Sequence, residues 1–137
     1  LQLLKEFTQV RFAIEPMAAK LAAENATPKQ LMQIEEALYR IAEAQEGLDD
    51  QLDAHINFLN MILLASGNRF FIQLTQFVDA ALRVSIRYTN QVKGISNTDV
   101  TFHVKVYNAI KDGDGASAQA LIYEVLSDAV ALIESRL

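Results

Sequence analysis

The chain of 137 residues contains no cysteine and no tryptophan, and it has only 2 prolines and 5 glycines. Without cysteine, neither a disulfide framework nor a thiolate metal site can form, which fits a reducing compartment, and we expect a cytoplasmic protein. No apolar run approaches the roughly 20 residues of a membrane-spanning helix, and the first residues lack the layout of a signal peptide. We therefore expect no contact with a membrane.

The residues that are present indicate one packed domain. The sequence is 51% hydrophobic and 21% charged, so a sizeable core can form and disorder is not expected. The net charge of -5 makes the chain a poor non-specific binder of phosphate backbones. If this protein contacts DNA, another part of it must do so. The chain begins with leucine rather than methionine, so we expect a fragment of a longer protein.

Apolar residues recur at helical spacing along almost the whole chain, and no segment alternates as a strand would. Pro16 predicts a kink or a break near Glu15 in the first helix, because proline removes a backbone donor. The pattern predicts an all-α, antiparallel bundle of about six helices that forms a single domain over residues 1–137. The predicted helices cover residues 2–24, 28–46, 48–65, 69–89, 99–111 and 114 to the end.

Several helix ends carry local signals. Thr27 is a candidate N-cap, followed by Pro28 at the first helical position. Gly67 is placed to take the left-handed conformation that ends a helix, and Asp114 is a candidate N-cap. These signals set the boundaries of the second, third and last predicted helices.

Three polar residues interrupt apolar stripes: Arg11 in the first predicted helix, His55 in the third and His103 in the fifth. Burying such groups costs free energy unless they are paired, so three polar residues directed inward indicate a polar cavity inside the bundle. A simpler interpretation stands beside this one. Arg11 can pair with Glu15 at i,i+4 or extend from the edge of the core, and a histidine on an apolar face is more often a packed core residue.

The other charged pairs and short motifs in the sequence do not indicate a catalytic site. Asp79 and Arg83 form an i,i+4 pair of the kind that usually decorates a surface. The sequence contains no P-loop, GxGxxG, GxSxG, HExxH or Glu-x-x-His motif, and sequence assigns no base to a nucleophile such as Ser85. We therefore expect that the protein is not an enzyme.

Three segments resemble a known family in the order in which that family has them. They are VRFAIEPMAAKLAAENAT, HINFLNMILLASGN and HVKVYNAIKDGDGASAQA, which together span residues 11 to about 125. They are similar to the C-terminal ligand-binding domain, of the FCD type, found in FadR-subfamily, GntR-type bacterial transcription regulators. The resemblance implies a FadR-like helical bundle that binds a small carboxylate effector, such as a hydroxy acid, sugar acid or dicarboxylate.

The resemblance also implies partners. Residues 1–137 would be the effector-binding and dimerisation domain of a homodimer. A winged helix-turn-helix domain, absent from this fragment, would bind the operator DNA. Effector binding would change how the two DNA-binding heads are presented.

Many family members also hold a divalent metal, often zinc, with one Asp and three His. The family Asp falls on His55, the first His on Leu59, the second on His103 and the third near Val125. Leu59 and Val125 cannot coordinate a metal, and two histidines are fewer than the three or four protein ligands of a zinc site. A retained metal would need the effector or another residue as a ligand; candidates are Asp53, Asn57 and Asn60.

We therefore expect a metal-free pocket in which Arg11 clamps the effector's carboxylate and His55 and His103 donate hydrogen bonds to it. Arg83 and Arg87 are further candidate effector contacts. The alternative is a helical module that only dimerises, with a degenerate pocket that binds neither metal nor effector. For the dimer interface, the first and fourth predicted helices are the candidates. The first has apolar residues outside its inward stripe, namely Leu3, Val10, Phe12 and Met17.

Overall fold

The computed structural model describes residues 2–75, 79, 83 and 100–135, and this part of the chain contains helices and no strand. Residues 69–75 are also helical, as the sequence predicted for the start of the fourth helix. The all-α prediction is confirmed. The elements are α1 (Gln2–Asn25), α2 (Pro28–Gln45), α3 (Gln51–Ala65), α5 (Val100–Lys111) and α6 (Gly115–Glu134).

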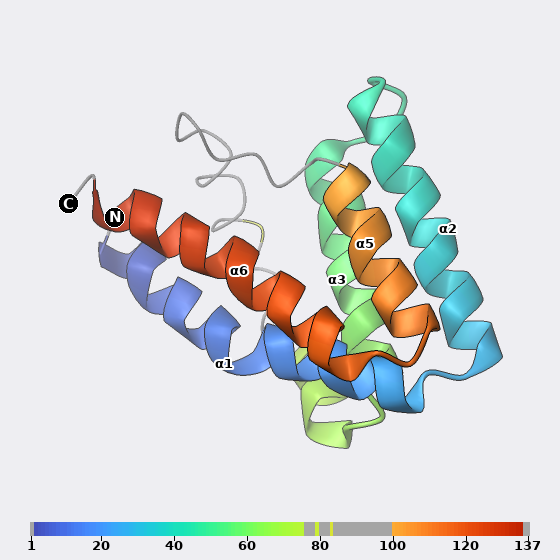
Figure 1. Cartoon of the computed structure of the whole chain (residues 1–137). Helices are drawn as coiled ribbons and strands as arrows, with labels where there is room; N and C mark the ends of the chain where they lie inside the picture. Colours follow the sequence, from blue (N-terminus) through green and yellow to red (C-terminus); the bar gives the residue numbers. More distant parts are fainter. Residues whose placement is uncertain (1, 76–78, 80–82, 84–99, 136–137) are drawn as a thin grey trace.

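The helices form two groups that cross one another (Figure 1). In one group α1 and α6 run side by side in opposite directions, with both ends of the chain at the same end of the pair. In the other group α2, α3 and α5 pack together, and α1 contacts both α3 and α5. The three residues predicted to form a polar cavity, Arg11, His55 and His103, lie on α1, α3 and α5.

The core lies between the two groups of helices. On α1 its members are small: Ala18, Ala19 and Ala22 are at most 1% exposed, which lets the neighbouring helices approach closely. The larger buried side chains come from the other helices, where they fill the remaining space. They include Ile34, Ile41, Phe58, Ile62, Val106, Ile110, Ile122 and Leu126.

The helix ends largely follow the predicted signals. Thr27 and Gln30 form a capping box, in which Gln30 N donates to Thr27 Oγ1 at 3.1 Å and Thr27 N donates to Gln30 Oε1 at 3.0 Å. Asp114 caps α6 by accepting a bond from Ser117 N at 3.1 Å. Gly67 has φ +72°, as predicted for the end of α3.

Two predicted details need correction or completion. Helix α3 begins at Gln51 rather than at residue 48, because Gly47 takes φ +80° and Asp50 caps the helix by accepting a bond from Asp53 N at 2.8 Å. Pro16 lies inside α1, and the helix continues through it without a break. Of the predicted helix over 69–89, residues 76–78, 80–82 and 84–89 lie outside the described residues, as does the loop predicted to follow them.

No helix in the described part of the chain is long and apolar enough to cross a bilayer.

The Thr27 cap gives a first testable prediction. Thr27→Ala is expected to lower the free energy of unfolding by about 1 kcal/mol, because the backbone N–H of Gln30 loses its partner. Urea unfolding followed by circular dichroism measures the loss. Thr27→Ser keeps the hydroxyl and is the matched control; an equal loss in both variants would show that the methyl group, not the cap, carries the effect.

Candidate functional site

A single pocket brings together residues from α1, α3, α5 and α6. Its cavity volume is about 20 Å³, roughly the space that one water molecule needs. Its walls are mostly apolar with a few polar side chains, which is the usual composition of a small-molecule site. The lining residues are Arg11, Glu15, His55, Phe58, Leu59, Phe102, His103, Ile122, Val125 and Leu126. The three polar residues that the sequence placed in one cavity, Arg11, His55 and His103, therefore do line the same pocket.

Arg11 and Glu15 form a buried ion pair on one wall of the pocket. Arg11 Nε donates to Glu15 Oε2 at 2.7 Å, and Nη2 donates to Oε1 at 3.4 Å. Arg11 is 4% exposed and Glu15 is 7% exposed. The i,i+4 pairing considered for Arg11 is confirmed, and it coexists with a place in the pocket. The positive charge of Arg11 and the negative charge of Glu15 add up to zero, so this wall of the pocket has no net charge.

The two histidines, from α3 and α5, contact each other at the pocket. The ring centroids of His55 and His103 are 5.1 Å apart, and their planes are nearly perpendicular at 88°. His103 also makes edge contacts with Phe58 and Phe102, at centroid distances of 5.0 Å and 5.3 Å. Three aromatic contacts therefore hold the ring of His103 at the pocket.

Comparison with known proteins decides the family. The chain matches the sequence profile of the FCD domain over residues 6–128. It is an FCD domain. The HTH-type transcriptional regulator McbR of Escherichia coli is 23% identical over 134 residues, which cover 95% of this chain and 61% of McbR. The HTH-type transcriptional regulator LutR of Bacillus subtilis is 30% identical over 132 residues, which cover 91% of this chain and 59% of LutR.

A solved structure agrees with the fold of this FCD domain. The Streptococcus agalactiae GntR structure superposes with a TM-score of 0.77 at 18% sequence identity, over 95% of this chain and 58% of that one. The FCD domain thus spans about three fifths of the length of the regulators that it resembles. The predicted family is confirmed, and both of these relatives are HTH-type transcriptional regulators.

The metal set implied by the family resemblance does not fit this FCD domain. Leu59 and Val125, at two of the four ligand positions, line the pocket with side chains that cannot coordinate. Glu15 lies in the same pocket, but both of its oxygens accept bonds from Arg11. In the part of the chain that the structure describes, no group of three or more His, Asp or Glu residues is placed to hold a metal ion.

Arg83 lies away from the pocket lining of the FCD domain. Its guanidinium pairs with Asp79, at 3.1 Å, and with Asp53 on α3, and its side chain is 44% exposed. The predicted Asp79–Arg83 pair is thus present, with Asp53 as a further partner. Arg87, the other arginine considered as an effector contact, lies outside the described residues.

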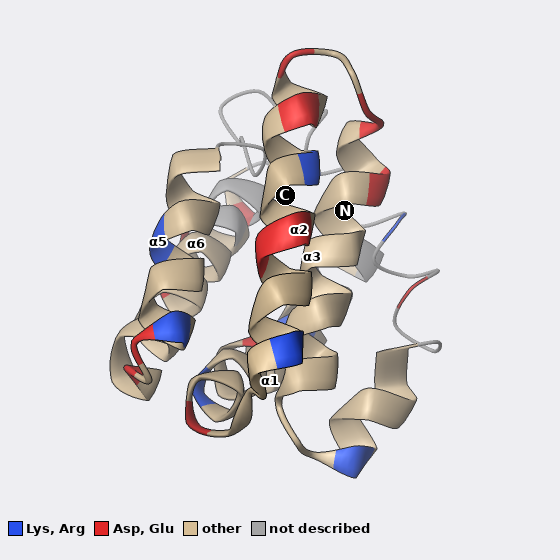
Figure 2. Ribbon diagram, turned by 90° about the vertical axis from the view of Figure 1, so that its right-hand side faces the viewer, with Lys and Arg blue, Asp and Glu red and all other residues tan. Residues whose placement is uncertain are grey.

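Acidic side chains gather where α2 ends and α3 begins (Figure 2). Arg40 lies within this group, and its Nε donates to Asp49 at 2.9 Å. This bond, together with one from the backbone N–H of Asp50, holds the pKa of Asp49 below its usual value. An acidic surface of this kind repels a phosphate backbone, as the net charge suggested.

Sequence reasoning missed part of the pocket wall. Phe58 and Phe102 were not among the predicted site residues, and Glu15 was considered only as a partner of Arg11. Phe58 is one helical turn from His55, and Phe102 precedes His103, so their proximity to the histidines could have been found from spacing. Ile122 and Leu126 could not be placed at the pocket without knowing how α6 packs.

Proposed function

We propose that this FCD domain binds a small carboxylate metabolite, such as a sugar acid, a hydroxy acid or another carboxylate, in the pocket between α1, α3, α5 and α6. Binding controls DNA recognition by a domain that lies outside this chain. One observation carries the proposal: Arg11, His55 and His103 come from three different helices and line the same pocket. In a mostly apolar site, a few convergent donors are what selects and orients a carboxylate.

Arg11 is the anchor for the carboxylate. A guanidinium carries five N–H donors, and Glu15 uses only those on the Nε and Nη2 edge. The guanidinium has further N–H donors, which in this proposal form the charge-assisted, paired hydrogen bonds that favour arginine at carboxylate sites. His55 and His103 add N–H donors, and the apolar walls exclude water and so strengthen these bonds. No metal has a part in this proposal.

A ligand in this pocket contacts four helices at once, because the lining residues come from α1, α3, α5 and α6. A ligand that favours one packing of these helices over another shifts their equilibrium by its difference in affinity. Through this change in helix packing, effector binding changes the DNA-binding domain of the regulator. The regulator works in the cytoplasm, where both its effector and its DNA are present.

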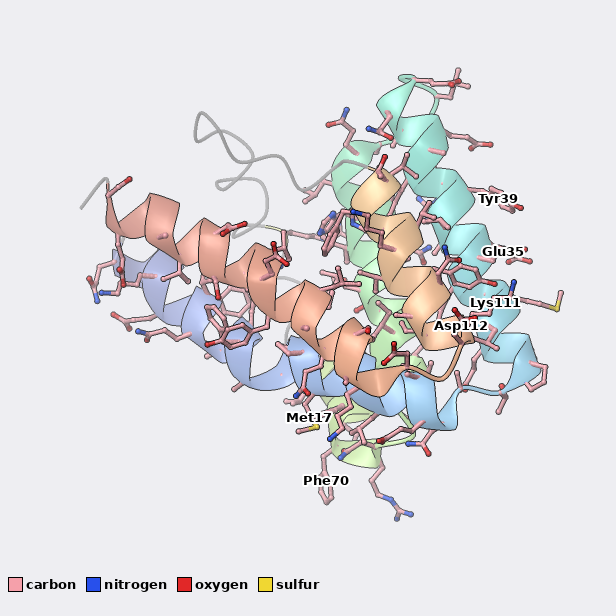
Figure 3. All side chains as sticks on the ribbon, viewed as in Figure 1. Met17, Glu35, Tyr39, Phe70, Lys111 and Asp112 are labelled. Atoms are coloured by element: carbon pink, nitrogen blue, oxygen red, sulfur yellow. The ribbon has the colours of Figure 1, made fainter. Side chains whose placement is uncertain are left out.

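The regulator also forms a homodimer in this proposal, with α1 as part of the interface. Val10 and Met17 on α1 are 41% and 38% exposed, which supports such a surface. Met17 and Phe70 lie at the same end of the molecule, away from Tyr39 on α2 (Figure 3). Phe12 instead packs edge to face on Tyr123, with the two ring centroids 5.1 Å apart. The side chain of Leu3 lies outside the described part of the chain.

Thermal unfolding with L-lactate, D-gluconate and succinate tests the proposed function. At least one of these carboxylates is expected to raise the melting temperature, because a ligand at 100 times its Kd adds about 2.7 kcal/mol of stability. His55→Leu keeps the bulk but removes the ring N–H groups, and it should weaken binding about tenfold, the loss of roughly one hydrogen bond to a charged group. Calorimetry measures the dissociation constants.

Asn57→Ala is the matched control for this experiment. Asn57 lies two residues from His55 on α3 and does not line the pocket, so binding should be unchanged. If none of the carboxylates binds, the second candidate function is favoured: a dimerisation module with a degenerate pocket. The observation behind that candidate is that Leu59 and Val125 line the pocket in place of ligands.

A further inference from the structure

Glu15 is an unexpected residue in a pocket that takes a carboxylate. It is 7% exposed, and it lines the same pocket as Arg11, His55 and His103. Among the described residues of the lining, Arg11 and Glu15 are the two with a formal charge when the histidines are neutral. Their charges sum to zero, so the pocket as a whole does not attract an anion. A second carboxylate beside Glu15 is repelled, and the repulsion is stronger here than in water because the walls are apolar.

The hydrogen bonds of the pair sharpen this conflict. Glu15 accepts both bonds from a single edge of Arg11, at 2.7 Å and 3.4 Å. An incoming carboxylate therefore has to share Arg11 with Glu15 or displace it, and displacement would leave a buried carboxylate without a partner. It is favourable for the ligand and Glu15 to share Arg11 only if the ligand also forms a hydrogen bond with Glu15. An ionised carboxylate only accepts hydrogen bonds, at about four lone-pair sites, so the ligand has to bring an O–H or N–H donor.

We propose that Glu15 is a specificity-determining residue of this pocket. It disfavours ligands whose only polar group is a carboxylate, and it favours those that place a hydrogen-bond donor beside the carboxylate. Glu15 also disfavours dicarboxylates that bring a second negative charge near it. This inference rests on the proposed function, which it narrows from carboxylates in general to carboxylates with an adjacent donor.

Glu15→Gln tests the role of the charge while keeping the length of the side chain and one oxygen acceptor for Arg11. The probes are propionate, L-lactate and propionamide, which are similar in size. Lactate adds a hydroxyl to propionate, and propionamide lacks the charge. In the natural protein lactate is expected to bind at least tenfold more tightly than propionate. In Glu15→Gln propionate is expected to gain at least tenfold, so this preference shrinks, while propionamide is unchanged.

Two further variants show where the gain comes from. Glu24→Gln makes the same charge change on the same helix at an exposed position outside the pocket, and it should leave all three affinities unchanged. The double variant Arg11→Gln/Glu15→Gln removes both charges, and it should lose the gain for propionate because the guanidinium is gone. A gain in Glu24→Gln, or an undiminished gain in the double variant, would overturn the proposal.

Folding of the variant is a separate readout. Glu15→Gln leaves the Arg11 charge buried without a carboxylate, so the variant is expected to be less stable in plain buffer. Propionate should restore its melting temperature more than propionamide does, even if the variant is unfolded at the start. Equal effects of the two compounds would contradict the proposal, since only propionate replaces the missing charge.

The outcomes separate this inference from the function on which it rests. If lactate binds the natural protein and His55→Leu weakens it, the effector pocket stands. An unchanged lactate-to-propionate ratio in Glu15→Gln then overturns the role of Glu15 alone. If neither the natural protein nor Glu15→Gln binds any carboxylate, both are overturned. Binding of propionate to Glu15→Gln but not to the natural protein supports the inference.

Discussion

Arg11→Gln is expected to lower the free energy of unfolding by about 3–5 kcal/mol, which is a large part of the 5–15 kcal/mol typical of a folded domain. The reason is the burial of Glu15, which is 7% exposed and accepts both of its hydrogen bonds from Arg11. Removing the cation leaves the carboxylate buried with neither a charge partner nor water. Urea unfolding, monitored by circular dichroism, measures the loss as a shift in midpoint.

The double variant Arg11→Gln/Glu15→Gln distinguishes this cause from simple loss of packing. With both charges removed, most of the stability should return, because replacing a buried ion pair by neutral groups costs little. The double-mutant cycle should therefore give a coupling of at least about 2 kcal/mol. Arg83→Gln is the matched control, because Arg83 also pairs with aspartates but is 44% exposed. Its cost should be much smaller than that of Arg11→Gln, because water screens an exposed pair. Equal losses in Arg11→Gln and Arg83→Gln would mean that water reaches the buried pair.

Much of the fold was predictable because local and global requirements agree. Apolar residues at helical spacing place the helices; a short polar residue such as Thr27 caps the start of one, and a glycine such as Gly67 ends another. The one boundary that was wrong, at the start of α3, has a physical reason. Leu48 continues the apolar stripe and therefore looked helical, but it is 72% exposed and Asp50 caps the helix two residues later. In this case a side chain that satisfies the free N–H groups decided the helix start, not the hydrophobic pattern.

The candidate site was predictable only in part. Burial penalties correctly placed Arg11, His55 and His103 in one pocket, because polar groups on apolar stripes need partners. Spacing alone could not show whether Glu15 would turn to solvent or to the pocket, since an i,i+4 pair forms equally well in either place. Arg83 shows the same limit, because one of its partners, Asp53, is 30 residues away in sequence. Such choices depend on how helices pack against one another.

Phe58 connects the core to the pocket and gives the second large prediction. It is 1% exposed, lines the pocket, and meets the ring of His103 at a centroid distance of 5.0 Å. Phe58→Ala is expected to lower the free energy of unfolding by about 3–5 kcal/mol, the usual cost of deleting a buried aromatic ring and leaving a cavity. Urea unfolding measures it, with an unchanged slope showing that the transition remains two-state.

The same variant also tests whether the position of His103 is set by packing. Without the Phe58 ring, His103 loses one of the aromatic contacts that hold it, so carboxylate binding should weaken at temperatures where the variant is still folded. Phe58→Leu fills more of the space and should cost less stability, roughly 1–1.5 kcal/mol. Phe58→Leu also lacks the aromatic ring, so carboxylate binding should weaken in this variant as it does in Phe58→Ala. If binding instead follows stability across the two variants, Phe58 acts through the core alone and His103 is held by its other neighbours.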